Sequence, residues 1–244
     1  MKAVAIVQAR MTSTRLPGKV LEDLAGATML ARVIERIRRA ASIHEIVIAT
    51  TTNATDDPLA SAASSLGVRV TRGDEHDVLS RYQLAARESA ADVVVRITSD
   101  CPLIDPVVID RCVARVTDTT DPVDYASNTI ERTYPRGLDV EAFHRDTLER
   151  IARFATSTPA REHVTYFLHR ERPALFVVAQ VLDTADNSDL RWTVDTPEDL
   201  ELVRQVYARG QLATRWLDYA ATVAIVRADP SLQALNAQIQ QKLV

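Results

Sequence analysis

The chain has 244 residues, 46% of them hydrophobic, which is enough to bury a substantial core as one domain with an appended piece or as two small domains. The formal charge of -4 at pH 7, with arginines alternating with acids along amphipathic helices, gives no electrostatic reason to expect nucleic acid as a partner. No apolar run is long enough to cross a bilayer and no signal-peptide pattern opens the chain, so we expect a soluble cytoplasmic protein with no membrane partner.

Short apolar runs alternate with helical patterns along the first half of the chain. Residues 3–7, 45–50 and 68–71 have the apolar, β-branched composition of buried strands. An amphipathic helix separates the first two, and its apolar face carries Leu30, Val33, Ile34 and Ile37. The next helix is expected to have Asp57 as its N-cap and Pro58 as its first residue. This order predicts an α/β fold, a mainly parallel twisted sheet with helices on both faces.

Residues 92–98 (DVVVRIT) form the clearest central strand, and Asp100 follows its C-terminal end. A carboxylate at that edge of a sheet is well placed to bind Mg²⁺, which takes oxygen ligands. Asp105 precedes a proline and is expected to be only the N-cap of the next helix. Cys101 lies among acids, whose negative charge raises a thiol pKa, so we expect Cys101 and Cys112 to be free thiols without a catalytic role.

The second half of the chain is expected to contain shorter elements around proline and glycine turns. In chain order these are strands at 124–128 and 138–143, helices at 144–154 and 160–170, and strands at 175–182 and 192–194. Thr196 is the expected N-cap of a further helix, which leaves Asp195 unexplained, and later helices are interrupted at Asp229-Pro230. We expect residues 1–210 to form the main domain, with residues 124–182 as an inserted hairpin and helical arm for substrate or dimer contacts, and residues 211–244 as a helical extension.

A cluster of cations follows the first strand, in the stretch Gln8–Lys19 (QARMTSTRLPGK). Arg10, Arg15 and Lys19 stand among small polar residues, and a Pro-Gly turn lets main-chain N–H groups approach an anion that these cations neutralise. The stretch is not a P-loop, because Ser13 stands where that motif needs glycine, and no G-x-G-x-x-G is present. The alternative interpretation is an exposed basic loop.

Pattern alone leaves three other groups of polar residues open. Asp77 and Arg81 are either a surface pair at i, i+4 or part of a site. Asp139 and Glu141 share one side of an alternating strand, which faces either a cleft or water. Arg136 has the guanidinium fork that binds a carboxylate or phosphate through two hydrogen bonds.

Several of these stretches resemble one protein family. The pattern R-x4-R-L-P-G-K after the first strand is similar to the signature of the sugar-activating cytidylyltransferases, and SDCPL stands at the place of their G-D-x-P-L motif. The strings YPRGLDVEAF, VDTPEDL and NAQIQQK resemble the branch called spore coat polysaccharide biosynthesis protein F, related to the synthetases of CMP-Kdo and CMP-sialic acid. The resemblance covers the chain to about Arg209 and implies a Rossmann-like, GT-A-like nucleotide-diphospho-sugar transferase fold.

The resemblance implies a role for each candidate residue. The CTP triphosphate would be bound by the first loop, through Gln8, Ala9, Arg10, Ser13, Arg15 and Lys19, and the base or ribose by Arg72, Asp77 and Arg81. Mg²⁺ would be bound by Asp100 and Asp195, and the expected catalytic residues are Arg10, Lys19 and Asp100. The acceptor would contact Arg136, Asp139, Glu141, Glu162 and His163, the last of which is by default a surface histidine. Ser99 and Cys101 replace a Gly and a Glu of the Kdo enzymes, which argues against Kdo as the acceptor.

The implied enzyme transfers CMP from CTP to a sugar acid or related acceptor and releases pyrophosphate, in the synthesis of a surface polysaccharide or glycan. Its relatives are commonly dimers, so a homodimer is expected. A first alternative is a cytidylyltransferase for a phosphorylated or phosphonate compound. A second is a metal-dependent glycosyltransferase, although its usual Asp-x-Asp motif is absent because Cys101-Pro102 follow Asp100. A third is a noncatalytic nucleotide-binding subunit.

Overall fold

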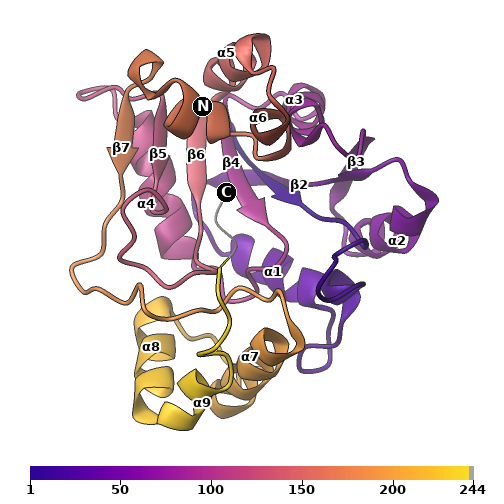
Figure 1. Ribbon diagram of the computed structural model, residues 1–244, viewed down its shortest axis with the longest axis vertical. Helices are drawn as coiled ribbons and strands as arrows, with labels where there is room; N and C mark the ends of the chain where they lie inside the picture. Colours follow the sequence, from indigo (N-terminus) through magenta and orange to yellow (C-terminus); the bar gives the residue numbers. More distant parts are fainter. Residues whose placement is uncertain (242–244) are drawn as a thin grey trace.

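The computed structural model describes residues 1–241, and within them seven strands form one sheet in the order β3-β2-β1-β4-β6-β5-β7 (Figure 1). Strands β1 to β4 pair in parallel with one another, β6 runs antiparallel to β4 and β5, and β7 pairs in parallel with β5. The strands are β1 (Ala3–Gln8), β2 (Ile43–Thr51), β3 (Arg69–Gly73), β4 (Val93–Thr98), β5 (Tyr125–Ser127), β6 (Glu141–His144) and β7 (Val178–Gln180). The mainly parallel sheet predicted from the sequence is confirmed.

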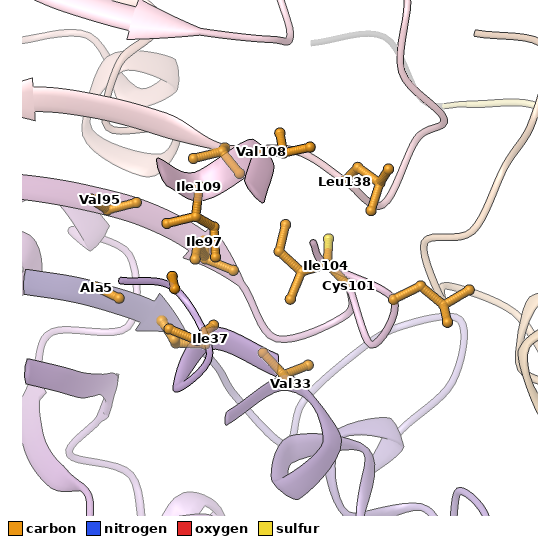
Figure 2. Packing of buried hydrophobic residues seen from close by; sticks show 14 of the residues in the cluster. Ala5, Val33, Ile37, Val95, Ile97, Cys101, Ile104, Val108, Ile109 and Leu138 are labelled. Atoms are coloured by element: carbon orange, nitrogen blue, oxygen red, sulfur yellow. The ribbon is translucent and has the colours of Figure 1, made fainter. Parts of the chain in front are cut away.

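Helices cover both faces of the sheet. The central strands are apolar at successive positions, so they present apolar side chains to both faces. Ala5 and Val7 of β1 point to the core under α1 (Met29–Ile37), α2 (Asp57–Ser65) and α4 (Pro106–Thr117). Val4 and Ile6 point to the opposite core, under α3 (Val78–Glu88), α5 (Arg145–Phe154) and α6 (Thr158–Glu162). Figure 2 shows the first of these cores, where side chains of α1 and α4 pack beside those of β1 and β4.

The C-terminal part of the described chain is helical. Thr196 and Asp199 form a capping box at the start of α7 (Pro197–Gly210), as the predicted N-cap requires. Helices α8 (Tyr219–Ala228) and α9 (Pro230–Ala234) pack against α7, and the segment after α9 runs back toward the sheet (Figure 1). Strands β5, β6 and β7 extend the main sheet, so the strands of residues 124–182 are continuous with it. The division at residue 210 stays a prediction.

Three expected elements differ from the sequence prediction. The helix expected at 160–170 is broken, because Val164 has a φ of 50°, and only a π-helical turn, Phe167–Glu171, follows α6. Asp57 is the first residue of α2 and not its cap, and the side chain of Asp56 at the cap position bonds elsewhere. The strand expected at 192–194 is replaced by irregular chain next to an isolated bridge between Arg136 and Arg191. The three short 3₁₀ turns are Lys19–Leu21, Ala54–Asp56 and Pro173–Leu175.

Across residues 1–241, no helix is both long and apolar enough to span a membrane. Asp105 and Thr28 each cap a helix, and only Asp105 was predicted to do so. Asp105 does cap α4, since its Oδ1 accepts a hydrogen bond from the Val107 N–H at 2.8 Å, and this confirms the structural role expected for it. Thr28, which the sequence did not single out, caps α1 through the Ala31 N–H.

Gly137 allows the turn before β6 to approach the chain that leads to Asp195. Its φ is +102°, and a Cβ at this position would lie 2.5 Å from the Thr193 nitrogen. We expect Gly137→Ala to lower the free energy of unfolding by about 3 kcal/mol or more, because backbone strain of about 1–3 kcal/mol is added to a backbone clash. Urea unfolding of Gly26→Ala is the control, since Gly26 has a φ of +82° with nothing within 4 Å. Equal losses in the two variants would contradict the close approach.

Candidate active site

The loop after β1 is tied to the sheet by a buried carboxylate. Asp56 accepts a hydrogen bond from the Met11 N–H at 2.7 Å and others from the hydroxyls of Thr50 and Thr51. Burial alone would raise the pKa of Asp56, but these hydrogen bonds outweigh it and lower the pKa. Gly18, with a φ of +74°, donates back to the Met11 carbonyl at 2.9 Å. The loop therefore has a fixed shape that delivers Lys19 to the sheet edge.

Lys19 lies between two carboxylates. Its Nζ donates to Asp100 Oδ2 at 3.0 Å and to Asp195 Oδ1 at 2.9 Å. A third hydrogen bond, of 2.6 Å, goes to the Val194 carbonyl. Burial would lower the pKa of Lys19, but the two carboxylates outweigh it and raise the pKa, so the ammonium stays charged.

The two acids come from segments far apart in the sequence. The Val194 N–H donates to the Asp100 carbonyl at 2.8 Å, which joins the chain after β4 to the chain before α7. The other oxygen of Asp195, Oδ2, is held by Arg15 at 2.9 Å and Arg191 at 3.0 Å. Burial would raise the pKa of Asp195, whereas Lys19, Arg15 and Arg191 together hold it below its ordinary value. Asp195 is therefore a carboxylate at neutral pH.

A cavity of about 460 Å³ opens over this cluster, and most of the predicted site residues line it. Those residues are Gln8, Ala9, Arg10, Ser13, Arg15, Lys19, Arg81, Asp100, Arg136, Asp139, Glu162, His163 and Asp195. Cations outnumber acids among them, which suits a polyanionic ligand. The structure thus brings together the predicted triphosphate loop, both predicted metal carboxylates and much of the predicted acceptor site.

Arg72 and Asp77, predicted to contact the base or ribose, are not among the residues lining the cavity. Arg72 donates to the carbonyls of Thr51 and Asn53 and pairs with Asp57. Asp77 caps α3 and pairs with Arg161. The surface pair of Asp77 with Arg81 is not formed.

Arg81 does line the cavity, and it is 1% exposed. Its Nη1 donates to the carbonyls of Asp74 and Glu75, and its Nε has no partner in the described part of the chain. Burial lowers its pKa. A buried guanidinium bonded only to carbonyls still has unbalanced positive charge, so this end of the cavity favours an anionic or strongly polar ligand.

Arg136 also lines the cavity. Within residues 1–241 its guanidinium has no hydrogen bond and no ion pair. Burial lowers its pKa, and so do the neighbouring charges of Arg132 and Arg191. Asp139 beside it is already paired with Arg132 through bonds of 2.6 and 3.0 Å. Arg136 is therefore available to bind an anionic group.

Comparison with known proteins agrees with this geometry. A family model described as cytidylyltransferase matches residues 4–223. The chain belongs to the cytidylyltransferase family. It is 34% identical over 213 residues to spore coat polysaccharide biosynthesis protein SpsF of Bacillus subtilis, covering 84% of this chain and 86% of that protein.

Solved structures share the fold. A cytidylyltransferase from Leptospira borgpetersenii superimposes with a TM-score of 0.90 at 30% identity, covering all of both chains. CMP:2-keto-3-deoxy-manno-octonic acid synthetase complexed with CTP superimposes with a TM-score of 0.68 at 23% identity, covering 86% of this chain and 100% of that one. The family resemblance expected from the sequence is confirmed, and the protein is a nucleotidyltransferase.

Glu141 of this cytidylyltransferase is buried behind the cavity wall, although the sequence predicted an acceptor contact. Its carboxylate pairs with Arg96 and accepts hydrogen bonds from the hydroxyls of Tyr125 and Thr165. Arg96 in turn lines the cavity, a position that the sequence analysis missed. The available signal was an arginine in the middle of the apolar strand DVVVRIT, because a buried guanidinium requires a partner.

The buried pair makes stability depend on pH. Burial would raise the pKa of Glu141, but Arg96 and the two hydroxyls outweigh it and hold the pKa below 4.5. Its contribution to stability is therefore present above pH 4.5 and is lost as the pH falls through the lowered value. We expect Glu141→Gln to lower the free energy of unfolding by about 3–5 kcal/mol at pH 7, because the Arg96 charge stays buried without a counter-ion.

Urea unfolding from pH 7 to pH 3 measures this effect. The gap between wild type and Glu141→Gln should narrow below pH 4.5. Glu149→Gln is the matched control, because Glu149 pairs with Arg87 on the surface and its loss should cost less than about 1 kcal/mol. A gap that stays constant with pH would contradict the buried ion pair.

Cys101 lines the cavity next to Asp100 but is almost wholly buried, and Figure 2 shows it beside Ile104 in the core. Burial raises its pKa far above the ordinary value, and Asp100 raises it further, so the thiol stays protonated. The sequence predicted a raised pKa for Cys101 from the neighbouring acids, and the pKa is raised, although burial is a larger cause than the acids. Cys112 is also buried, and both are free thiols.

His163 faces the cavity, and burial lowers its pKa, so it is mostly neutral at pH 7.

Proposed function

We propose that the protein transfers CMP from CTP to a small acceptor that carries an anionic group, with release of pyrophosphate. The observation that supports this best is Lys19 between Asp100 and Asp195 in a cavity rich in cations. Such a site combines carboxylates for a divalent cation with an ammonium and guanidinium groups for a triphosphate.

Transfer of CMP requires that the acceptor and CTP are positioned for reaction and that the charge on the phosphates is stabilised. An oxygen of the acceptor attacks the α-phosphorus in line, and the bond to the bridging oxygen of the β-phosphate breaks. Lys19, Arg10 and Arg15 neutralise the negative charge that builds on the pyrophosphate. Arg81, together with the chain at Gln8 and Ala9, lines the same cavity and contacts the nucleoside in this proposal.

The oxygen donors of Asp100 and Asp195 fit Mg²⁺, which uses one or two carboxylates and takes further ligands from substrate phosphates and water. Within residues 1–241, no three acidic, cysteine or histidine side chains form a cluster suited to a metal ion. Bound Mg²⁺ would supply Lewis-acid stabilisation of the phosphates. Both oxygens of Asp195 already contact cations, Oδ1 through Lys19 and Oδ2 through Arg15 and Arg191.

The acceptor is proposed to contact Arg136, with Glu162 and His163 near by on the cavity wall. Arg136 has the fork that binds a carboxylate or phosphate, and no residue in the described chain uses it. A sugar acid therefore fits, as does a phosphorylated or phosphonate compound. The name of the SpsF relative supports a role in polysaccharide synthesis.

We also propose a homodimer that acts in the cytoplasm, where its substrate CTP is made. Phe154 at the end of α5, and Leu175 and Val177 in the chain that leads into the edge strand β7, are large apolar side chains that are each more than half exposed. An exposed apolar patch next to a sheet edge is typical of an interface. Light scattering tests it, because Val177→Asp should give a monomer and an unchanged mass would contradict this interface.

The test of the reaction is pyrophosphate release with each of the four nucleoside triphosphates and Mg²⁺. The acceptors are nonulosonic acids, other sugar acids, sugar phosphates and phosphonates. We expect release with CTP and one class of acceptor. Release of a nucleotide from a nucleotide sugar, with none of pyrophosphate, would favour a glycosyltransferase. CTP binding by calorimetry without turnover on any acceptor would favour a noncatalytic subunit.

A further inference from the structure

The carboxylate of Asp199 is fully buried and receives five hydrogen bonds. Two come from Arg191, at 2.9 and 3.0 Å, and two from the main-chain N–H groups of Asp195 and Thr196. The capping box explains the bond to Thr196 only. The remaining bonds fix the guanidinium of Arg191 and the main chain of Asp195 relative to each other.

Arg191, held in place by Asp199, also bonds Asp195, the predicted metal ligand. The Nη2 atom that bonds Asp199 also bonds Asp195 Oδ2 at 3.0 Å. A guanidinium fixed at Nε and Nη2 has a defined plane, so it defines where the Asp195 carboxylate points. Asp195 Oδ1 is left facing Lys19 and the cavity.

The fifth bond to Asp199 comes from the C-terminal segment, residues 235–241, which follows α9. Asn236 is 5% exposed, and its amide nitrogen donates to Asp199 Oδ1 at 2.8 Å and to the Arg191 carbonyl at 3.0 Å. At the end of the same segment, Gln241 accepts a hydrogen bond from Arg191 Nη1 and lines the cavity. This segment lies beyond the residues that match the family model, which end at 223. It contains most of the NAQIQQK string, whose Lys242 is outside the described residues.

We propose that Asn236 is a positioning residue for Asp195, acting through Asp199 and Arg191, and that the C-terminal segment is part of the working site. This rests on the proposed function, in which Asp195 binds a divalent cation. Asn236 donates two hydrogen bonds to the pair that orients Asp195, and Gln241 accepts a hydrogen bond from Arg191 Nη1. Without Asn236 or Gln241 the pair of Asp199 and Arg191 loses hydrogen bonds that hold it in place, so the Asp195 carboxylate that it orients is held less firmly.

The experiment measures Mn²⁺ affinity in the presence of CTP, by the electron paramagnetic resonance signal of free Mn²⁺. We expect Asn236→Ala to weaken Mn²⁺ binding about 10-fold or more, as is typical for loss of a group that orients a metal ligand. The Mg²⁺ concentration for half-maximal pyrophosphate release should rise in parallel. Gln241→Ala, which removes a partly exposed side chain and leaves the core intact, should weaken Mn²⁺ binding in the same direction and serves if Asn236→Ala fails to fold.

Asn187→Ala is the matched control. Asn187 is also buried, donates to the Tyr219 hydroxyl at 2.8 Å and accepts from Arg227, and it has no bond to Arg191, Asp195 or Asp199. It should lower the unfolding temperature without changing Mn²⁺ affinity. If Asp195→Asn weakens Mn²⁺ binding but Asn236→Ala and Gln241→Ala do not, the positioning role is overturned while the proposed function stands. If Asp195→Asn also leaves Mn²⁺ binding unchanged, the metal site of the proposed function is overturned with it.

Discussion

Lys19→Ala is expected to lower the turnover number for pyrophosphate release by about a hundredfold or more. The ammonium is placed at the two carboxylates and is the cation of the loop that is most deeply buried, where its charge is little screened by water. Loss of one preorganised electrostatic group commonly costs about 10²–10³ in turnover. Steady-state kinetics at saturating CTP and Mg²⁺ measure the loss, and circular dichroism verifies that the variant is folded.

Lys2→Ala is the control for this variant. Lys2 also makes partly buried contacts, to Glu45 and to the Ser89 carbonyl, both at 2.7 Å, but it precedes the N-terminal end of β1, whereas the cavity opens after the C-terminal end. Its removal should leave turnover unchanged. Equal turnover of Lys19→Ala and wild type would mean that the ammonium has only a structural role.

Asp100→Asn should have an effect of similar size, about a hundredfold or more in turnover, by loss of charge without loss of shape. Asparagine can still accept the hydrogen bond that the Thr98 hydroxyl gives to Oδ1 at 2.6 Å. It is a much weaker ligand for Mg²⁺ than a carboxylate, so we also expect the Mg²⁺ requirement to rise. A titration of activity with Mg²⁺ separates this from loss of CTP binding, which should change little.

Asp110→Asn gives the comparison for Asp100→Asn. Asp110 lies on α4 and accepts hydrogen bonds from the main chain at Ala41 and Ser42 and from the Ser42 hydroxyl. These three hydrogen bonds give Asp110 a structural role, and Asp110 does not line the cavity. Unchanged Mg²⁺ dependence in Asp100→Asn would remove that residue from the metal site.

Much of the fold was predictable because its signals are local. The apolar runs that became β1, β2 and β4 are buried on both faces, and the spacing of Leu30, Val33, Ile34 and Ile37 gives α1 its single apolar side. Breaks in that pattern were not predictable. Val164 leaves the helical conformation with a positive φ, although the residues on either side of it follow a helical spacing.

In the candidate site, too, the residues with a local sequence signal could be predicted and those that depend on tertiary contacts could not. The loop after β1 and the two acids follow strands or begin helices, so their place at the C-terminal edge of the sheet could be predicted. Arg72 lies in β3 and Glu141 in β6, but their side chains bind partners that are distant in the sequence. Arg72 donates to the Thr51 carbonyl, and Glu141 pairs with the guanidinium of Arg96. Asn236 gave no local signal, because its function depends on Asp199, 37 residues away in the chain.

The transfer of label from CTP tests the central claim most directly. The enzyme is incubated with Mg²⁺, an acceptor that supports pyrophosphate release, and CTP labelled with ³²P at either the α or the γ position. We expect the α label to appear in a conjugate of CMP with the acceptor, in amounts equal to the γ label found in pyrophosphate, with neither formed by Lys19→Ala at a comparable rate. Label from the γ position in free phosphate, or an acceptor product without the α label, would contradict cytidylyl transfer.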